Sequence, residues 1–314
     1  MGLAIGVDIG GTKVAAGVVD EQGRIVATAR RDTPSHDPAK IEEIISDLVR
    51  ELQAFNEVEA VGIGAAGFVD AARAKVIFAP NLAWRNEPLR DSIETRCRLP
   101  VVVENDANAA AWAEARFGAG RGHEYLVILT IGTGLGGGLV VDGRLYRGRL
   151  GIAAELGHLT VEPGGRRCGC GGRGCWERYA SGTALVHEAQ ELATVSPAIA
   201  GRMLALAGGK PEAITGLAVT QAARDGDEAA LEAFRSVGAW LGQGMASIAA
   251  VLDPGMFVIG GGVSAAGSLL CEPAERALQE HITARAYREM PSVRLAELGP
   301  EAGIVGAADL ARQR

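Results

Sequence analysis

The chain has 314 residues, enough for two domains of ordinary size with substantial hydrophobic cores. Apolar residues make up 48% of it, charged residues 22% and aromatic residues 4%, which is typical of a globular protein. The net charge of −7 and the lack of a long basic run argue against a nucleic-acid partner, because phosphate backbones are bound by clustered lysine and arginine. The 44 glycines, about twice the usual share of ~7%, require an explanation.

The N-terminal stretch MGLAIGVDIGG lacks the basic and long apolar regions of a secretory signal, and the sequence has no run of about 18 uninterrupted apolar residues. We therefore expect a cytoplasmic protein without a membrane partner. Thiols stay reduced in the cytosol, so a cluster of cysteines there favours a metal site over a disulfide framework.

Hydrophobic periodicity predicts the elements in chain order. Three short strands are expected at 3–9, 13–20 and 24–33, followed by an amphipathic helix over 39–55 and an apolar strand within 60–70. Residues 99–118 indicate a strand, a polar elbow and an alanine-rich helix. The second half is expected to be largely helical, with helices at 183–192, 228–252 and 272–289, one strand within 254–267 and a closing helix at 302–312.

The strand, loop and strand pattern of the N-terminus recurs at 125–148, where a tight Asp142-Gly143 turn joins two strands. Ile9-Gly10 is repeated as Ile131-Gly132, and Val18-Val19-Asp20 as Val140-Val141-Asp142. This repeat predicts an internal duplication, with two related domains that each supply one glycine loop.

Glycine-rich loops follow three apolar strands. Backbone N–H groups in such loops approach an anion closely, so three of them indicate a polyphosphate ligand, although each one is also compatible with a tight turn. Thr12 and Thr133 offer hydroxyl donors, and Lys13 either adds charge or faces solvent. A strand follows the second loop, which excludes the dinucleotide fingerprint, and no Walker A sequence occurs. The loops are Asp8-Ile9-Gly10-Gly11-Thr12-Lys13, Gly132-Thr133-Gly134-Leu135-Gly136-Gly137 and Gly260-Gly261-Gly262.

Carboxylates stand beside two strand ends. Asp8, at the end of the first strand, is a candidate for holding Mg²⁺ directly or through water, or else caps a turn. Asp106, in the elbow Glu104-Asn105-Asp106, is either the N-cap of the following helix or a general base, with Asn105 helping to grip a polyol. Phosphoryl transfer requires mostly positioning and one carboxylate near the nucleophile, which fits the second interpretation.

The stretch HLTVEPGGRRCGCGGRGCWE contains His158, Cys168, Cys170 and Cys175. One imidazole and three thiolates form a closed tetrahedral set of the kind that structural zinc prefers, and the alternative is a group of unmetallated buried thiols. A zinc ion there would leave no open position for water. It would instead fix Glu155 and Glu177, which are either sugar-binding carboxylates or surface charges.

Several motifs together carry a family resemblance: DIGGTK near the N-terminus, END before a helix, IGTGLGGG, the ELGH of residues 155–158, and CGCGGRGCWE. Over nearly its whole length the chain resembles the ROK family of sugar kinases and repressors, within the hexokinase/actin-like ATPase superfamily. It is most similar to bacterial ATP-dependent glucose kinases. Repressors of the family carry a DNA-binding segment ahead of the DIGGT strand, whereas here that strand begins by Leu3, so an enzyme is expected.

The resemblance implies an α/β fold of two ribonuclease-H-like domains, as in actin and hexokinase, with a cleft between them. The small domain is expected at 1–105, completed by a C-terminal helix at 301–314, and the large domain at 106–300. A homodimer or homotetramer is also implied. The expected reaction is transfer of phosphate from ATP to the 6-hydroxyl of glucose, a step of glycolysis. Other hexoses (N-acetylglucosamine, N-acetylmannosamine or fructose), polyphosphate as donor and a non-catalytic sugar sensor remain alternatives.

The resemblance also implies roles for individual residues. Asp106 matches the general base, and one nitrogen of His158 would bind zinc while the other meets a sugar hydroxyl. The sugar ligands would be Gly67, Asn81, Asn105, Asp106, Glu155, His158 and Glu177. The residues around ATP and Mg²⁺ would be Asp8, Gly10, Gly11, Thr12 and Lys13 with Thr133, Gly134, Gly260, Gly261 and Gly262.

Overall fold

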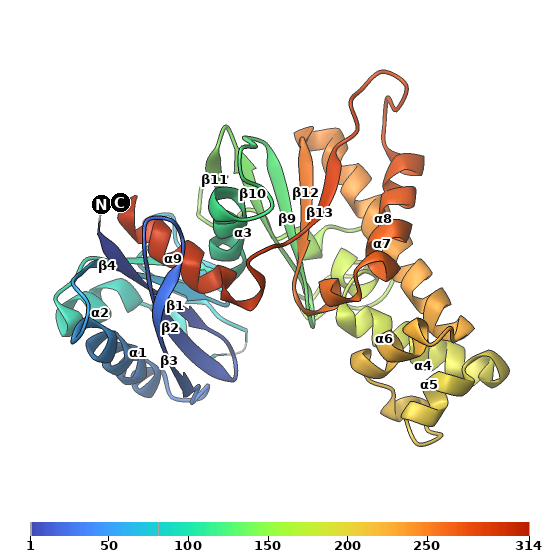
Figure 1. The fold of residues 1–314 in the computed structure, drawn as a ribbon, viewed down its shortest axis with the longest axis horizontal. Helices are drawn as coiled ribbons and strands as arrows, with labels where there is room; N and C mark the ends of the chain where they lie inside the picture. The colour runs from blue at the N-terminus through green and yellow to red at the C-terminus, as the bar shows by residue number, and fades with distance from the viewer. Residues whose placement is uncertain (1, 81, 314) are drawn as a thin grey trace. The chain divides into compact units, whose positions relative to one another are not determined.

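The computed structural model describes residues 2–80 and 82–313, and it has an α/β fold built on two five-stranded sheets (Figure 1). The strands are β1 Leu3–Ile9, β2 Lys13–Val19, β3 Ile25–Asp32, β4 Val58–Ala65, β5 Phe68–Val69, β6 Val76–Phe78, β7 Arg85–Glu87, β8 Val101–Asn105, β9 Leu126–Ile131, β10 Leu135–Val141, β11 Arg144–Tyr146, β12 Met256–Gly260 and β13 Ser292–Leu295. The α-helices are α1 Pro38–Gln53, α2 Leu89–Cys97, α3 Asp106–Phe117, α4 Gly182–Val195, α5 Gly201–Leu206, α6 Gly216–Arg224, α7 Glu228–Leu252, α8 Ser268–His281 and α9 Ala302–Arg312.

The contacts divide the chain into two compact units. The first comprises residues 1–128, 137–154 and 297–314, and the second comprises 129–136 and 155–296. The C-terminal helix α9 belongs to the first unit, and so do α3 and residues 137–154. The domain boundaries expected after 105 and 300 therefore do not coincide with these units, and they remain a prediction.

The first sheet has the strand order β3-β2-β1-β4-β8. β1, β2 and β3 form the predicted antiparallel meander, whereas β4 and β8 run parallel to β1. Ile9 pairs with Ala65 and Ala65 pairs with Asn105, so the carboxyl ends of the three parallel strands lie at one edge of the sheet. Loops that follow these strands consequently share that edge.

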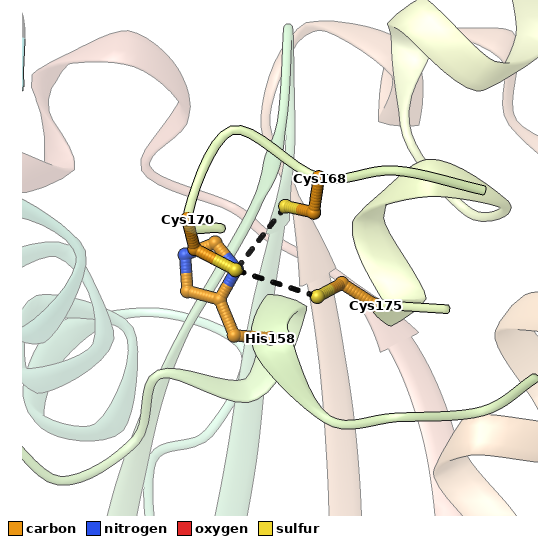
Figure 2. A group of neighbouring side chains, drawn as sticks. All are labelled: His158, Cys168, Cys170 and Cys175. Carbon is orange, nitrogen blue, oxygen red and sulfur yellow. Dashed lines mark hydrogen bonds between the residues drawn. The ribbon is translucent and has the colours of Figure 1, made fainter. Parts of the chain in front are cut away.

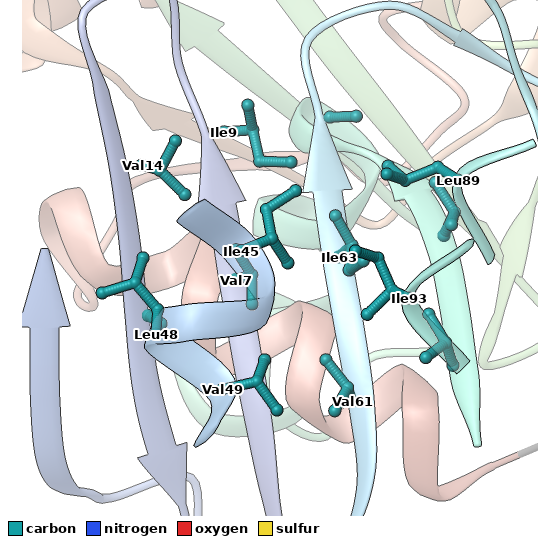
Figure 3. Packing of buried hydrophobic residues seen from close by; sticks show 14 of the residues in the cluster. Val7, Ile9, Val14, Ile45, Leu48, Val49, Val61, Ile63, Leu89 and Ile93 are labelled. Carbon is teal, nitrogen blue, oxygen red and sulfur yellow. The ribbon is translucent and has the colours of Figure 1, made fainter. Parts of the chain in front are cut away.

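Helix α1 covers one face of this sheet. Its apolar residues recur at helical spacing and pack on the strands, where Ile45, Leu48 and Val49 lie among Val7, Val14 and other fully buried side chains (Figure 3). Asp37 is the N-cap of the helix, since its side chain accepts a hydrogen bond from the backbone N–H of Lys40. The predicted helix at 39–55 is thus confirmed, with its end two residues earlier.

Helix α9 lies against the first sheet (Figure 1) at backbone distance. A Cβ atom on Gly6 of β1 would lie 1.8 Å from the carbonyl oxygen of Ile304, and one on Gly62 of β4 would lie 1.8 Å from that of Ala307. Glycine at these positions is therefore required for the packing, which accounts for part of the unusual glycine content. The closing helix expected at 302–312 is confirmed.

The second sheet has the order β11-β10-β9-β12-β13, which repeats the order of the first sheet strand for strand. As in the first sheet, the hairpin β10-β11 is antiparallel and the pair β12-β13 is parallel. Asp142 and Gly143 form the two-residue hairpin turn with φ of +52° and +67°, the left-handed values that such a turn requires. The predicted duplication agrees with this repeated topology.

The helices of the second half confirm the sequence pattern with one correction. Helix α7 has the expected bounds of 228–252 and packs against α8 (Figure 1). Helix α8 runs from Ser268 to His281 rather than from 272 to 289, because Ile282 is extended and buried and Ala284 has a φ of +56°. The short elements α2, α5, α6, β6, β7 and β13 were not predicted. Within the described residues, no helix combines the length and hydrophobicity needed to cross a bilayer.

Candidate active site and metal centre

The carboxyl edge of β1, β4 and β8 brings together the candidate residues of the first unit. Asn105 ends β8 and is the N-cap of α3, since its Oδ1 atom accepts a hydrogen bond of 3.0 Å from the backbone N–H of Asn108. Its Nδ2 atom donates to the carbonyl oxygen of Gly67, 3.1 Å away in the loop after β4. Asp106 is the first helical residue rather than the cap, so the simple capping interpretation of Asp106 is wrong.

Asp106 and Asp8 are half-buried carboxylates on this edge. Burial raises the pKa of Asp106, although hydrogen bonds from the backbone N–H groups of Ala107 and Asp106 itself lower it in part. Burial, and then the negative charge of Asp106, raise the pKa of Asp8 from 3.8 to about 6. Two carboxylates of this kind form a site that attracts protons or a cation.

The first glycine loop is a tight turn between β1 and β2. The N–H of Gly10 donates to the carbonyl oxygen of Lys13, 2.9 Å away, and the carbonyl oxygen of Gly10 accepts from Thr33 Oγ1 at 2.9 Å. Gly11, Thr12 and Lys13 are exposed at the turn. Their exposure leaves the turn accessible to a ligand.

The other two glycine loops meet within the second unit. Gly261, with a φ of +85°, follows β12 and lies against the end of β9, where a Cβ atom would stand 2.5 Å from the carbonyl oxygen of Ile131. Gly260 is the last residue of β12, and Gly262 begins a short helical turn. The structure thus brings the predicted phosphate loops at 132–134 and 260–262 together.

Helix α4 anchors the second loop, a relationship that the sequence analysis missed. The N–H of Gly182 donates to the carbonyl oxygen of Gly132 at 2.8 Å, and Thr183 Oγ1 donates to that of Thr133 at 2.6 Å. Ser181 caps the same helix. The Ser-Gly-Thr sequence signals a helix start, but its contact with a loop some fifty residues earlier has no local signature.

Figure 2 shows the predicted metal ligands converging from two segments of the second unit. The ligand atoms of His158, Cys168, Cys170 and Cys175 all lie within 4.8 Å of one another. Cys168 Sγ is 3.7 Å from His158 Nδ1, and the sulfur atoms of Cys170 and Cys175 are 3.6 Å apart. Tetrahedral zinc with Zn–S bonds of about 2.3 Å has ligand separations of about 3.8 Å, so the residues fit this metal.

The sulfur geometry excludes the disulfide alternative, since Cys170 and Cys175 are free thiols. Burial is the largest effect that raises the pKa of Cys168, to about 12, whereas the backbone N–H of Gly172 lowers that of Cys170. A bound zinc ion would overcome the first effect, because it deprotonates a coordinating thiol.

Both predicted carboxylates lie beside the metal ligands. Glu155 Oε2 is 4.0 Å from His158 Nε2, the ring nitrogen turned away from Cys168. Glu177 Oε1 accepts from the Cys168 thiol at 2.9 Å, and a Cβ atom on Gly134 would stand 2.7 Å from Glu177 Oε2. Glu177 therefore lies between the metal ligands and the second glycine loop. The predicted sugar ligand Asn81 lies outside the described residues.

Comparisons with known proteins settle the family. Residues 4–314 match the ROK family. The chain belongs to this family. A glucokinase of Streptomyces coelicolor is 49% identical over 313 residues, spanning 100% of the chain and 98% of that protein. A glucokinase of Thermotoga maritima is 39% identical over 318 residues, spanning 99% and 97%.

Among solved structures, the chain is similar to a ROK family glucokinase from Streptomyces griseus in complex with glucose and AMPPNP. The TM-score is 0.89 at 51% identity, and the match covers all of both chains. This similarity confirms the α/β fold with two mixed five-stranded sheets. The ROK membership and the fold expected from the motifs are therefore both confirmed.

Proposed function

We propose that this ROK protein is a glucokinase that transfers the γ-phosphoryl group of ATP to the 6-hydroxyl of glucose. The observation that carries the proposal is the half-buried Asp106 at the carboxyl edge of the first sheet, with a raised pKa, in a chain that matches glucokinases over its full length. The relative from Streptomyces griseus was solved with glucose and an ATP analogue, which supports the choice of both substrates.

Asp106 acts as the general base in this proposal. Its carboxylate accepts the proton of the 6-hydroxyl while that oxygen forms a bond to the γ-phosphorus, and the bond from the γ-phosphorus to the bridging oxygen of ADP breaks. A raised pKa makes the carboxylate a stronger proton acceptor than an exposed aspartate. Asn105, already fixed by Gly67 and Asn108, supplies an amide beside it.

We assign the nucleotide phosphates to the glycine loops. Backbone N–H groups and the hydroxyls of Thr12 and Thr133 are donors for phosphate oxygens. Asp8 is assigned to Mg²⁺ that accompanies ATP, because magnesium prefers oxygen ligands and offsets the cost of burying this carboxylate. The other residues assigned to ATP are Gly10, Gly11, Lys13, Gly134, Gly260, Gly261 and Gly262.

We assign zinc to His158 and the three cysteines as a structural ion. Four protein ligands leave no open position, so the ion supplies rigidity rather than an activated water. His158 bound through Nδ1 would keep Nε2 for a hydroxyl of the sugar, next to Glu155. Gly67, Asn81, Glu155 and Glu177 complete the assigned sugar ligands.

A coupled assay of ADP release tests the proposal, with glucose, N-acetylglucosamine, N-acetylmannosamine and fructose as acceptors and with ATP or polyphosphate as donor. We expect the highest kcat/KM for glucose with ATP. Preference for another hexose would replace the substrate while retaining the reaction, and no turnover of any hexose would overturn the proposal. The cytoplasmic location and the homodimer or homotetramer remain predictions.

A further inference from the structure

A buried ion cluster lies directly behind the Asn105-Asp106 elbow. Glu104, the penultimate residue of strand β8, has a side chain that is 1% exposed, and its Oε2 atom lies 2.7 Å from Arg147 Nε and 3.1 Å from Arg73 Nε. We call these three residues the Glu104 cluster. An unpaired carboxylate at this depth would be costly, and the two arginine side chains supply the opposite charge beside it.

The other oxygen of Glu104 holds the first turn of α3. Oε1 accepts hydrogen bonds from the backbone N–H of Asn105 at 3.0 Å and from Asn108 Nδ2 at 3.1 Å. Asn108 in turn donates its own N–H to Asn105 Oδ1. Glu104 therefore contacts Asn105, which precedes Asp106, and Asn108, which follows Asp106 by two residues.

The two arginines tie this turn to neighbouring segments of the first unit. Arg147 donates to the carbonyl oxygens of Asp70, at 2.9 Å, and Ala71, at 3.1 Å, in the turn between β5 and β6. Arg73 belongs to the same turn, and its carbonyl oxygen accepts from the N–H of Val103 in β8. The cluster thus fixes the end of β8 against two other parts of the backbone.

We infer that Glu104 is a positioning residue that aims the carboxylate of Asp106, and that Arg73 and Arg147 hold Glu104 in place for this purpose. Stability is a weak explanation for the cluster, because a buried ion pair often contributes no more than apolar residues of the same volume. The hydrogen bonds that the Oε1 atom of Glu104 accepts from the Asn105 N–H and from Asn108 Nδ2 do, however, fix a direction, and the arginines hold the Oε2 atom by charge. The inference rests on the proposed role of Asp106 as base.

The test compares Glu104→Gln with Glu114→Gln. The first substitution keeps the size of the side chain but removes the charge that the arginines hold. Glu114 is a matched control: it is 2% exposed, lies in α3 itself, and accepts hydrogen bonds from the backbone N–H groups of Ala119, Glu297 and Leu298. Melting temperature, kcat, and the KM values for glucose and MgATP are measured for both variants.

We expect Glu104→Gln to lower kcat at least about tenfold while the KM for MgATP changes less than about twofold, because a small misplacement of a catalytic group is enough for such a loss. Glu114→Gln should lower the melting temperature with kcat within about twofold of the wild type. A folded Glu104→Gln variant with wild-type kcat would overturn the inference. An equal loss of kcat in both variants would do the same.

If Glu104→Gln does not fold, Arg147→Lys replaces it, since Glu104 then keeps Arg73 as a partner. A fall in kcat at unchanged KM for MgATP is again expected, and wild-type kcat overturns the inference. If the wild type phosphorylates no hexose, the proposed function fails independently. Hydrogen exchange at the Asn105 and Asn108 amides then decides whether Glu104 holds the elbow: faster exchange in the variant supports this, and unchanged exchange contradicts it.

Discussion

Gly157 lies in backbone contact with Leu135, because a Cβ atom on Gly157 would stand only 2.1 Å from the Leu135 carbonyl oxygen. Gly157 precedes the metal ligand His158 in a short helical turn, and Leu135 begins the strand after the second glycine loop. The metal centre and the proposed phosphate loop are therefore packed on each other within the second unit. A substitution that displaces the metal centre should therefore also displace the phosphate loop, and the reverse should hold.

Gly157→Ala tests this contact. The added methyl group must displace either the turn that carries His158 or β10, so we expect a loss of about 1–3 kcal/mol in the free energy of unfolding and a higher KM for ATP as well as for glucose. Gly169→Ala is the control, because a Cβ atom on Gly169, between two cysteine ligands, would meet nothing within 4 Å. Unchanged KM values in a folded Gly157→Ala variant would show that the contact does not link the two sites.

Removal of one metal ligand should separate the role of zinc from that of the thiols. Cys175 is 2% exposed and belongs to the ligand cluster. Cys175→Ser should abolish binding of about one zinc ion per chain and lower the melting temperature. It should also raise the glucose KM about tenfold or more, because His158 is no longer held in its orientation. Elemental analysis, calorimetry and kinetics check these outcomes. Cys271→Ser, outside the cluster, should retain zinc. A zinc-free variant with wild-type stability and kinetics would contradict a bracing role.

Much of the fold followed from periodicity and turn chemistry. Apolar residues alternate along the strands of the β1–β3 meander and recur at helical spacing in α7 and α9, and these elements lie where the sequence predicts them. The predicted end of α8 at Glu289 was wrong, because the helical spacing of apolar residues continues past His281, whereas the backbone leaves the helix at Ile282. Ile282 is buried in an extended conformation, and helical spacing alone does not record where tertiary packing overrides it.

The candidate site was predictable where a motif is contiguous. The four metal ligands and the Asn105-Asp106 elbow each stand within one short stretch, and the structure brings the ligands together as expected. The Glu104 cluster was not predictable, because Arg73 and Arg147 come from separate loops and meet Glu104 only through tertiary contacts. No spacing in the sequence links these residues.

Asp8→Asn should change the pH dependence of stability. Because the pKa of Asp8 is raised from 3.8 to about 6, the folded state binds more protons than the unfolded state between these values. The free energy of unfolding of the wild type therefore falls as the pH rises from about 4 towards 6. Above pH 6 the total decrease is about 3 kcal/mol. Asparagine does not ionise, so the variant should be more stable than the wild type at neutral pH, by an amount that disappears below about pH 4.

Urea unfolding of magnesium-free and nucleotide-free protein at several pH values measures this difference. Asp225→Asn is the control of opposite sign, since hydrogen bonds from Arg202 and Gln221 lower the pKa of Asp225. That variant should gain nothing at neutral pH. A difference between Asp8→Asn and the wild type that is the same at pH 4 and at neutral pH would contradict the ionisation argument.

Asp106→Asn separates catalysis from binding. The amide keeps the size of the side chain and a hydrogen-bond acceptor but cannot accept the proton of the 6-hydroxyl, so we expect kcat to fall about 10²–10⁴-fold. Helix α3 should persist because Asn105, not Asp106, is its N-cap. Calorimetric titration should then still detect glucose binding, within a few-fold of the wild-type affinity. Normal turnover would exclude Asp106 as the base, whereas loss of both binding and turnover would assign it to sugar recognition instead.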